Sequence, residues 1–223
     1  MPQISRFYFA GAFLPFEPLL APAAQVIQAE SGRYLTGPGE ELRRVFYIKS
    51  GYCRFSLLRE DGGETILSFH GPGSLHPVKC RQFHFTLEQF VLYQTITEAE
   101  IWSLEPQAIE ELVRRDPDFA VAAVDYHTVY SNMYLARQAL NARVDVEAKI
   151  AAFLYLYAAG QGGGGEIPLS QGDTAAALGV SRVQVSRAYR RLRGLGAIAP
   201  YRNGVKILDM ELLKSLCAGG LAD

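Results

Sequence analysis

The sequence predicts an α+β protein built from an amino-terminal double-stranded β-roll, a long helix and a carboxy-terminal winged helix-turn-helix. Short segments rich in β-branched and aromatic residues fill the first half of the chain. A stretch without Gly or Pro then runs from about Asp118 to Ala142. Two short helices separated at Gly179 follow, and the second is basic. The expected domains are the roll, the long helix and the helix-turn-helix, at residues 1–117, 118–142 and 143–223.

Turn residues divide the first half into candidate strands. Ser50-Gly51, Asp61-Gly-Gly63 and Gly71-Pro-Gly73 are the turns. The segments between and after them are Val45–Ile48, Tyr52–Leu57, Thr65–Phe69 and Phe90–Ile96. Strands spaced in this way are typical of a β-barrel or a double-sheet roll.

The long helix carries apolar residues at alternating spacings of four and three. These residues are Ala122, Tyr126, Val129, Met133, Ala136 and Leu140. The spacing predicts a coiled-coil seam and therefore a homodimer, although it also suits packing within one chain. Shorter helices are expected at Ala108–Arg115 and Val144–Ala158, and the glycines of Gln161–Gly165 are expected to form a flexible loop.

The clearest local pattern lies between Leu169 and Leu208. Ser170 and Asp173 can begin one helix, Gly179 supplies the positive φ of a turn, and Ser181 can cap a second helix. Two short apolar segments flank Asn203-Gly204, a preferred hairpin turn, so a β-wing is expected to follow.

Positive charge is concentrated in the same region. The whole chain has a net charge of −1, yet residues 181–208 contain no Asp or Glu and seven basic residues. Such a cluster suits a phosphate backbone, which makes double-stranded DNA the expected partner. The candidate DNA-binding residues are Ser181, Arg182, Val183, Gln184, Ser186, Arg187 and Arg190.

Composition bounds the other functions. No apolar run is long enough to cross a bilayer and the first residues lack a signal-peptide pattern, so we expect a cytoplasmic protein without a membrane partner. Cys53, Cys80 and Cys217 lie far apart and lack the spacing of a zinc or redox site. We expect no catalytic residues, no metal and no cofactor.

On these residues the chain resembles the Crp/Fnr family of bacterial transcription regulators, whose roll is cyclic-nucleotide-binding-like. Val45–Gly51, Asp61–Glu64 and Gly71–Gly73 look like its roll landmarks, and Ala175–Arg182 and Val185–Arg187 look like its DNA-binding domain. The resemblance implies a homodimer that is not an enzyme, that contacts RNA polymerase and that reads an inverted repeat.

Departures from the family pattern narrow the effector. Ser74–Cys80 and Gln89 stand where cyclic-nucleotide-binding members carry a Gly-Glu pair and a phosphate-binding arginine, which argues against cyclic AMP. No cysteine precedes Cys53, which excludes the amino-terminal cysteine cluster of iron–sulfur members.

Three alternatives remain open. Pro2 resembles that of haem-binding members, but their Cys-x-His ligand region has no counterpart around His76 or Cys80. A thiol-redox regulator would use Cys53 or Cys80 as a single-thiol switch. A cupin-like metalloenzyme lacks support, because His70, His76 and His84 lack His-x-His spacing.

The remaining effector class is a small aromatic or phenolic acid. Tyr126, Tyr130 and Tyr134 recur every fourth residue, and the segment after Gly73 supplies cationic or basic groups. The candidate effector residues are His76, Lys79, Arg81, Tyr126, Tyr130 and Tyr134. The aromatic segment Phe7–Phe16 could cover such a pocket, but the tyrosines also suit ordinary core packing. Val183–Arg187 and Tyr134–Gln138 resemble the branch that controls reductive dehalogenation, whose effectors are halogenated phenolic acids.

The resemblance also bears on the operator. Arg187 matches the principal base-reading arginine of the family and Ser186 its small neighbour. Most relatives have Glu where Val183 stands, and Val contacts a thymine methyl instead of a cytosine amino group. We therefore expect an A·T-rich inverted repeat.

Overall fold

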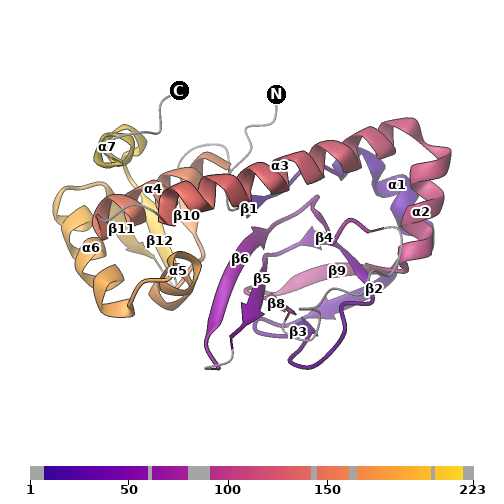
Figure 1. Ribbon diagram of the computed structural model, residues 1–223, viewed down its shortest axis with the longest axis horizontal. Coiled ribbons are helices and arrows are strands. Elements are labelled where there is room, and N and C mark those ends of the chain that lie inside the picture. Colours follow the sequence, from indigo (N-terminus) through magenta and orange to yellow (C-terminus); the bar gives the residue numbers. More distant parts are fainter. Residues whose placement is uncertain are drawn as a thin grey trace. The chain divides into compact units, whose positions relative to one another are not determined.

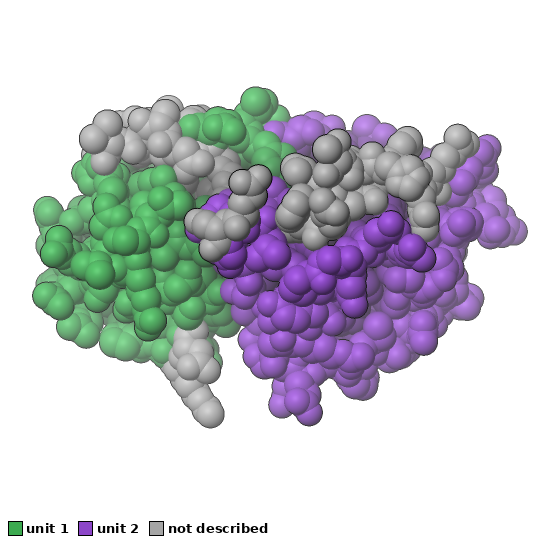
Figure 2. Space-filling model, turned by 60° about the horizontal axis from the view of Figure 1, so that its bottom comes forward, with its two compact units in different colours: residues 1–8, 132–223 green, residues 9–131 purple. Residues whose placement is uncertain are grey.

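The computed structural model describes residues 8–59, 62–79, 91–141, 145–160, 165–201 and 204–217. The chain divides into two compact units (Figure 2). One comprises residues 9–131, and the other comprises residues 1–8 with residues 132–223. The division falls inside one long helix, so this helix contributes to both units. Each unit is described by itself.

Two antiparallel sheets form the roll of unit 9–131 (Figure 1). One sheet has the strand order β1-β6-β5-β8-β3 and the other β2-β9-β4-β7. The strands are β1 (Tyr8–Phe9), β2 (Gln25–Ala29), β3 (Tyr34–Thr36), β4 (Val45–Ser50), β5 (Cys53–Leu58), β6 (Glu64–His70), β7 (Leu75–His76), β8 (Val91–Thr95) and β9 (Ala99–Leu104). The helical segments beside them are η1 (Leu14–Phe16), α1 (Glu17–Leu20), η2 (Ala21–Ala23) and α2 (Pro106–Arg115).

The four predicted strands correspond to β4, β5, β6 and β8. Gly51 turns β4 into β5 with φ of +81°, and a Cβ there would lie 2.3 Å from the carbonyl oxygen of Glu98. Only glycine therefore fits this turn without displacing the backbone. The sequence does not predict β1, β2, β3, β7 and β9, since each is short or lies beside no strong turn residue.

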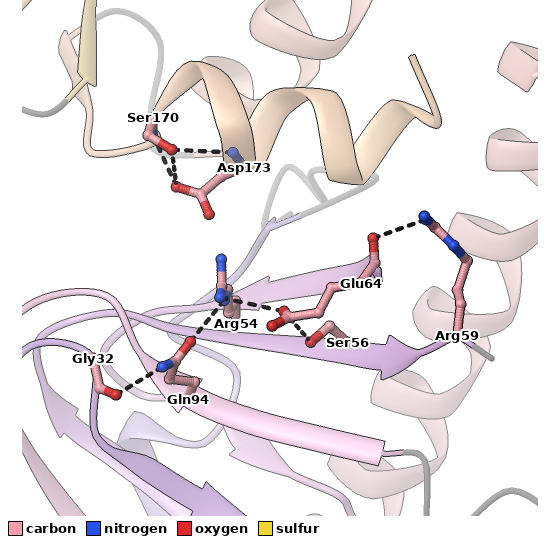
Figure 3. Close-up of polar contacts among 8 residues, drawn as sticks. All are labelled: Gly32, Arg54, Ser56, Arg59, Glu64, Gln94, Ser170 and Asp173. Carbon is pink, nitrogen blue, oxygen red and sulfur yellow. Dashed lines mark hydrogen bonds and ion pairs between the residues drawn. The ribbon is translucent and has the colours of Figure 1, made fainter. Parts of the chain in front are cut away.

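Polar side chains join three neighbouring strands of the five-stranded sheet (Figure 3). Arg54 of β5 forms an ion pair of 3.2 Å with Glu64 of β6, and its Nε donates to Gln94 Oε1 of β8 at 3.1 Å. The Ser56 hydroxyl also donates to Glu64 at 3.1 Å. These contacts fix the order of the strands on a face that is only partly buried.

Helix α3 spans Pro117–Asn141, within one residue of the prediction at each end. The seam assigned to it is wrong, because Tyr126 and Met133 are only 4% and 1% exposed within the single chain. They are core residues and cannot form the centre of an exposed seam. The side chains of Ala136 and Leu140 lie outside the described part. The exposed apolar residues of α3 include Val121, Val124 and Leu135, at 59%, 64% and 69% exposure.

The second unit contains a three-stranded sheet and four helices besides the end of α3. The helices are α4 (Val146–Gly160), α5 (Gln171–Leu178), α6 (Arg182–Gly194) and α7 (Met210–Leu216). The strands are β10 (Gly165–Ile167), β11 (Ile198–Tyr201) and β12 (Gly204–Ile207), in the order β10-β12-β11.

The predicted wing corresponds to β11 and β12, while Asn203 of its turn lies outside the described residues. Strand β10 is an addition that the sequence does not predict. It begins at Gly165, the last residue of the segment expected to be a loop, and that residue pairs with Ile207 of the wing. The wing is therefore the edge of a three-stranded sheet.

Candidate functional site

Two capping boxes hold helices α5 and α6. The Ser170 hydroxyl accepts from the Asp173 N–H at 3.1 Å, while the Ser170 N–H donates to the Asp173 carboxylate at 3.0 Å (Figure 3). Ser181 and Gln184 repeat this arrangement at the start of α6, at 3.2 and 2.8 Å. Each box satisfies N–H groups that a helix start leaves unpaired. Between the helices, Gly179 has φ of +63°, as the sequence predicts.

One face of α6 packs into the unit. Val185, Ala188 and Leu192 are buried on it. The Tyr189 hydroxyl lies 3.0 Å from Thr174 Oγ1 of α5, and burial raises the pKa of Tyr189 to about 12. This contact fixes α6 against α5 (Figure 1).

The rest of the α6 surface holds the predicted DNA-binding residues. Val183 is 60% exposed, Ser186 is half-buried, and the other candidates are exposed; they are Ser181, Arg182, Gln184, Arg187 and Arg190. The Gln184 carboxamide oxygen already accepts from the Ser181 N–H, so a ligand would meet mainly its amide nitrogen.

Arg191 has a different role from the other arginines of α6. Its Nε lies 3.0 Å from a carboxylate oxygen of Glu147 in α4. The pair neutralises one of the seven positive charges counted in the sequence. Charge counting along the chain cannot find this pair, because Glu147 lies outside the basic segment.

A hollow of about 420 Å³ opens beside α6. The side chains that line it come from α6, the wing and the start of α5. They are Leu169, Ser170, Gln171, Arg182, Ser186, Tyr189, Arg190, Arg193, Ile198, Ala199, Pro200, Tyr201, Gly204 and Val205. The sequence does not predict this hollow, because its wall depends on where the wing lies relative to the helix.

A second group of polar and aromatic side chains lies inside the roll. The Tyr130 hydroxyl of α3 is hydrogen-bonded to Ser68 of β6 at 2.6 Å, and Ser68 also lies 2.9 Å from His70 Nε2. The rings of His70 and His76 are 4.3 Å apart, centroid to centroid. Phe9 stacks on Tyr130 at 4.8 Å. We call this group the roll cluster; its members are Phe9, Ser68, His70, His76, Tyr93, Tyr126 and Tyr130.

The roll cluster contains unsatisfied polar atoms. Among the residues that the structure describes, neither ring nitrogen of His76 has a hydrogen-bond partner, and neither does the hydroxyl of Tyr93. The rings of these two residues are 5.6 Å apart. Buried polar groups usually have partners, so a polar ligand or a water could satisfy them.

Two expectations about charge in the roll are wrong. The sequence suggests that His76 helps to hold an anion, but burial lowers its pKa to about 3 and it is neutral at pH 7. Burial also raises the pKa of the Cys53 thiol, which disfavours the thiolate needed for a redox switch. The Lys79 ammonium donates to the Leu42 carbonyl. Cys80, Arg81, His84 and Gln89 lie outside the described residues.

The three tyrosines of α3 differ in environment. Tyr126 is buried, Tyr130 is half-buried and Tyr134 is exposed. The rings of Tyr126 and Tyr130 are 5.9 Å apart and both belong to the roll unit, whereas Tyr134 belongs to the other unit. Within the described part of the chain, no three His, Cys, Asp or Glu residues come together as metal ligands.

Residues 148–216 match the family model described as a Crp-like helix-turn-helix domain. This segment contains both capped helices and the wing. The chain carries a Crp-like helix-turn-helix domain. No curated protein sequence matches the chain. None of the helices in the described ranges is both long and apolar enough to span a membrane.

Solved structures extend the Crp-like fold beyond this domain. FixK2 from Bradyrhizobium japonicum is 19% identical, with a TM-score of 0.73 over 88% of this chain and 98% of that chain. A CooA mutant from Carboxydothermus hydrogenoformans is 19% identical, with a TM-score of 0.75 over 96% and 99%. CprK complexed with OCPA is 19% identical, with a TM-score of 0.70 over 96% and 97%. At these identities the likeness concerns the fold. Together with the domain match, it supports a DNA-binding transcription regulator of the Crp/Fnr type.

Proposed function

We propose that this protein is an effector-responsive transcription regulator that binds an A·T-rich inverted repeat as a homodimer. The observation that carries the proposal is the exposed surface of α6, where Arg182, Val183 and Arg187 project from a helix capped at Ser181 and fixed by Tyr189. A rigid, basic helix of this kind suits the major groove. The proposed partners are double-stranded DNA, RNA polymerase, a second copy of the chain and a small molecule.

The A·T preference rests on Val183. An exposed valine in the first turn of α6 offers only methyl groups, which suit the methyl group of thymine. Arg187 lies further along the same helix and can form a bidentate contact with guanine. We therefore propose a half-site in which one guanine lies close to an A·T step.

The homodimer is assigned to a different face of α3 from the one predicted. Val121, Val124 and Leu135 are exposed, and Thr128 and Ser131 are exposed at positions between them. These five positions follow spacings of three, four, three and four, as in a two-stranded coiled coil. We call them the exposed stripe. Covering this stripe with a second copy would remove three large apolar side chains from water.

The effector is proposed to bind at the roll cluster. Tyr126, Tyr130 and Phe9 supply aromatic surface, and the unsatisfied atoms of His76 and Tyr93 could bond with a polar ligand group. Because His76 is neutral, the carboxylate of an aromatic acid needs a cation from elsewhere.

Lys79 is the candidate for that cation, since it follows His76 by only three residues. CprK, which shares the fold, has been solved with OCPA and with o-chlorophenolacetic acid. A small aromatic or phenolic acid is therefore the proposed effector class.

Operator selection tests the regulator proposal. The protein would be used to enrich duplexes from a random pool, and the enriched site would be compared with random DNA at fixed salt. We expect an inverted repeat, and Arg187→Ala should reduce discrimination for it by about 1–3 kcal/mol. Recovery of no common site, or unchanged discrimination in Arg187→Ala, would contradict the assignment of α6 as the reading helix.

A further inference from the structure

The hollow beside α6 has a wall with a strong positive charge. Arg182, Arg190 and Arg193 line it from α6, and all three are exposed. Ser186 and Tyr201 add hydroxyl groups to the same wall. The hollow therefore combines three cations with hydrogen-bond donors, which is the chemistry that binds phosphate.

The position of Arg193 separates it from the base-reading residues. Arg182, Ser186, Tyr189 and Arg193 follow one another at spacings of four, three and four, so they share a stripe of α6 that lines the hollow with the wing. Arg193 lies about three turns beyond the amino end of α6, whereas base contacts in helix-turn-helix proteins come from the first turns. Its guanidinium is therefore placed for the DNA backbone and not for base edges.

The start of α5 forms another part of the wall. Ser170 is the N-cap of α5 and Gln171 is its first residue. A helix start favours an anion through its partial positive charge and its N–H groups. The carboxylate of Asp173 already uses part of this potential through Ser170, so the arginines must supply most of the attraction.

We propose that this hollow seats a DNA phosphodiester backbone beside the half-site, with Arg190 and Arg193 as phosphate contacts. The inference rests on the proposed DNA-binding function and adds a second, sequence-independent contact region to it. Arg193 is then a positioning residue that fixes the register of α6 on the duplex. Its removal should weaken binding of the operator and of random DNA by the same factor.

The test compares Arg193→Gln with Arg191→Gln. Both variants remove one positive charge from α6, but Arg191 is paired with Glu147. For each protein, the dissociation constant would be measured on the selected operator and on random duplex across a range of salt concentrations. For Arg193→Gln we expect about fivefold weaker binding of both duplexes at about 0.15 M salt, and a salt slope smaller by about 0.9. Arg191→Gln should keep the wild-type slope, and Arg193→Lys should restore it.

The outcomes separate the inference from the proposed function. An unchanged slope and affinity in a folded Arg193→Gln protein would overturn the phosphate seat while leaving regulator function intact. A selective loss of operator binding would also overturn it, because Arg193 would then read bases. Failure of the wild-type protein to bind any duplex would overturn the proposed function and the seat together. Circular dichroism and the Tm of each variant establish that it is folded.

Discussion

The ring of Tyr130 stacks on the ring of His76, with 5.3 Å between their centroids and 17° between their planes. Tyr130 belongs to the long helix and His76 to a short strand of the roll. A hydrogen bond from Tyr130 to Ser68 adds a second link between the same helix and the roll. A ligand that enters the roll cluster must therefore alter contacts of α3, and a ligand with different affinities for two positions of α3 would shift the equilibrium between them.

Replacing Tyr130 by Phe tests the effector proposal. The variant keeps the ring and removes the hydroxyl, so a bound phenolic acid should lose about 0.5–1.5 kcal/mol of affinity. The probe would be 4-hydroxyphenylacetate, or another aromatic acid that raises the Tm in a thermal scan, and calorimetry would give its affinity.

The control for this variant is Ser68→Ala. Tyr130→Phe also loses the bond to Ser68, which should cost roughly 1 kcal/mol of stability, and Ser68→Ala loses the same bond while keeping the phenol. Equal ligand affinities in wild type, Tyr130→Phe and Lys79→Ala would place the pocket elsewhere.

Acid should destabilise the roll through His76. Its folded-state pKa of about 3 lies below the ordinary value of 6.5, so the unfolded chain binds more protons between these values. The contribution to stability is full above pH 6.5 and falls as the pH drops through that window. At about pH 5 the loss from His76 should be about 2 kcal/mol relative to about pH 7.5. Urea unfolding at a series of pH values measures it.

His76→Phe supplies the comparison for this measurement. Phenylalanine keeps an aromatic ring and does not titrate, so the stability of the variant should depend less on pH by about the same 2 kcal/mol. Some dependence should remain, because burial also lowers the pKa of His70. His127→Gln is the control and should keep most of the dependence, since burial lowers the pKa of His76 more than the charge of His127 does. Parallel curves for wild type and His76→Phe would show that His76 is not neutral in the folded state.

The exposed stripe of α3 can be tested by charge. Val124→Asp leaves the single chain intact because Val124 is 64% exposed, but it would bury a carboxylate in the proposed dimer at a cost of several kcal/mol. Sedimentation should give a monomer, and operator binding should weaken with it. Asp125→Asn is the control, because it changes the charge by one unit at an exposed position beside the stripe and should leave the dimer unaffected. A dimeric Val124→Asp protein would contradict the assigned face.

The operator preference can be tested by reversing the unusual residue of α6. Val183→Glu should shift the preference at one symmetric position toward C·G, because glutamate accepts from the cytosine amino group. The change should be worth about 1–3 kcal/mol at that base pair and little elsewhere. Selection from a random pool with both proteins measures it. Identical half-sites would show that Val183 does not reach the base edges.

Local rules in the sequence predict the helix-turn-helix well. Ser170, Gly179 and Ser181 lie at the helix ends and turn where capping chemistry requires them, because those interactions involve residues only three or four apart. Long-range packing is harder to predict. The spacing that includes Met133 is the same for an exposed seam and for a core, and the neutrality of His76 depends on burial by residues from distant strands. Strand β10 escapes prediction because it is short and starts at a glycine.

The contacts of α6 limit how this protein could be given a new DNA specificity. Arg182, Val183 and Arg187, in the first two turns, are exposed to solvent. Tyr189 and Arg191, in contrast, pair with Thr174 and Glu147 of neighbouring helices. A chimera that imports only the first two turns of another regulator's helix should therefore fold, whereas one that imports the whole helix must bring the matching residues of α4 and α5 with it.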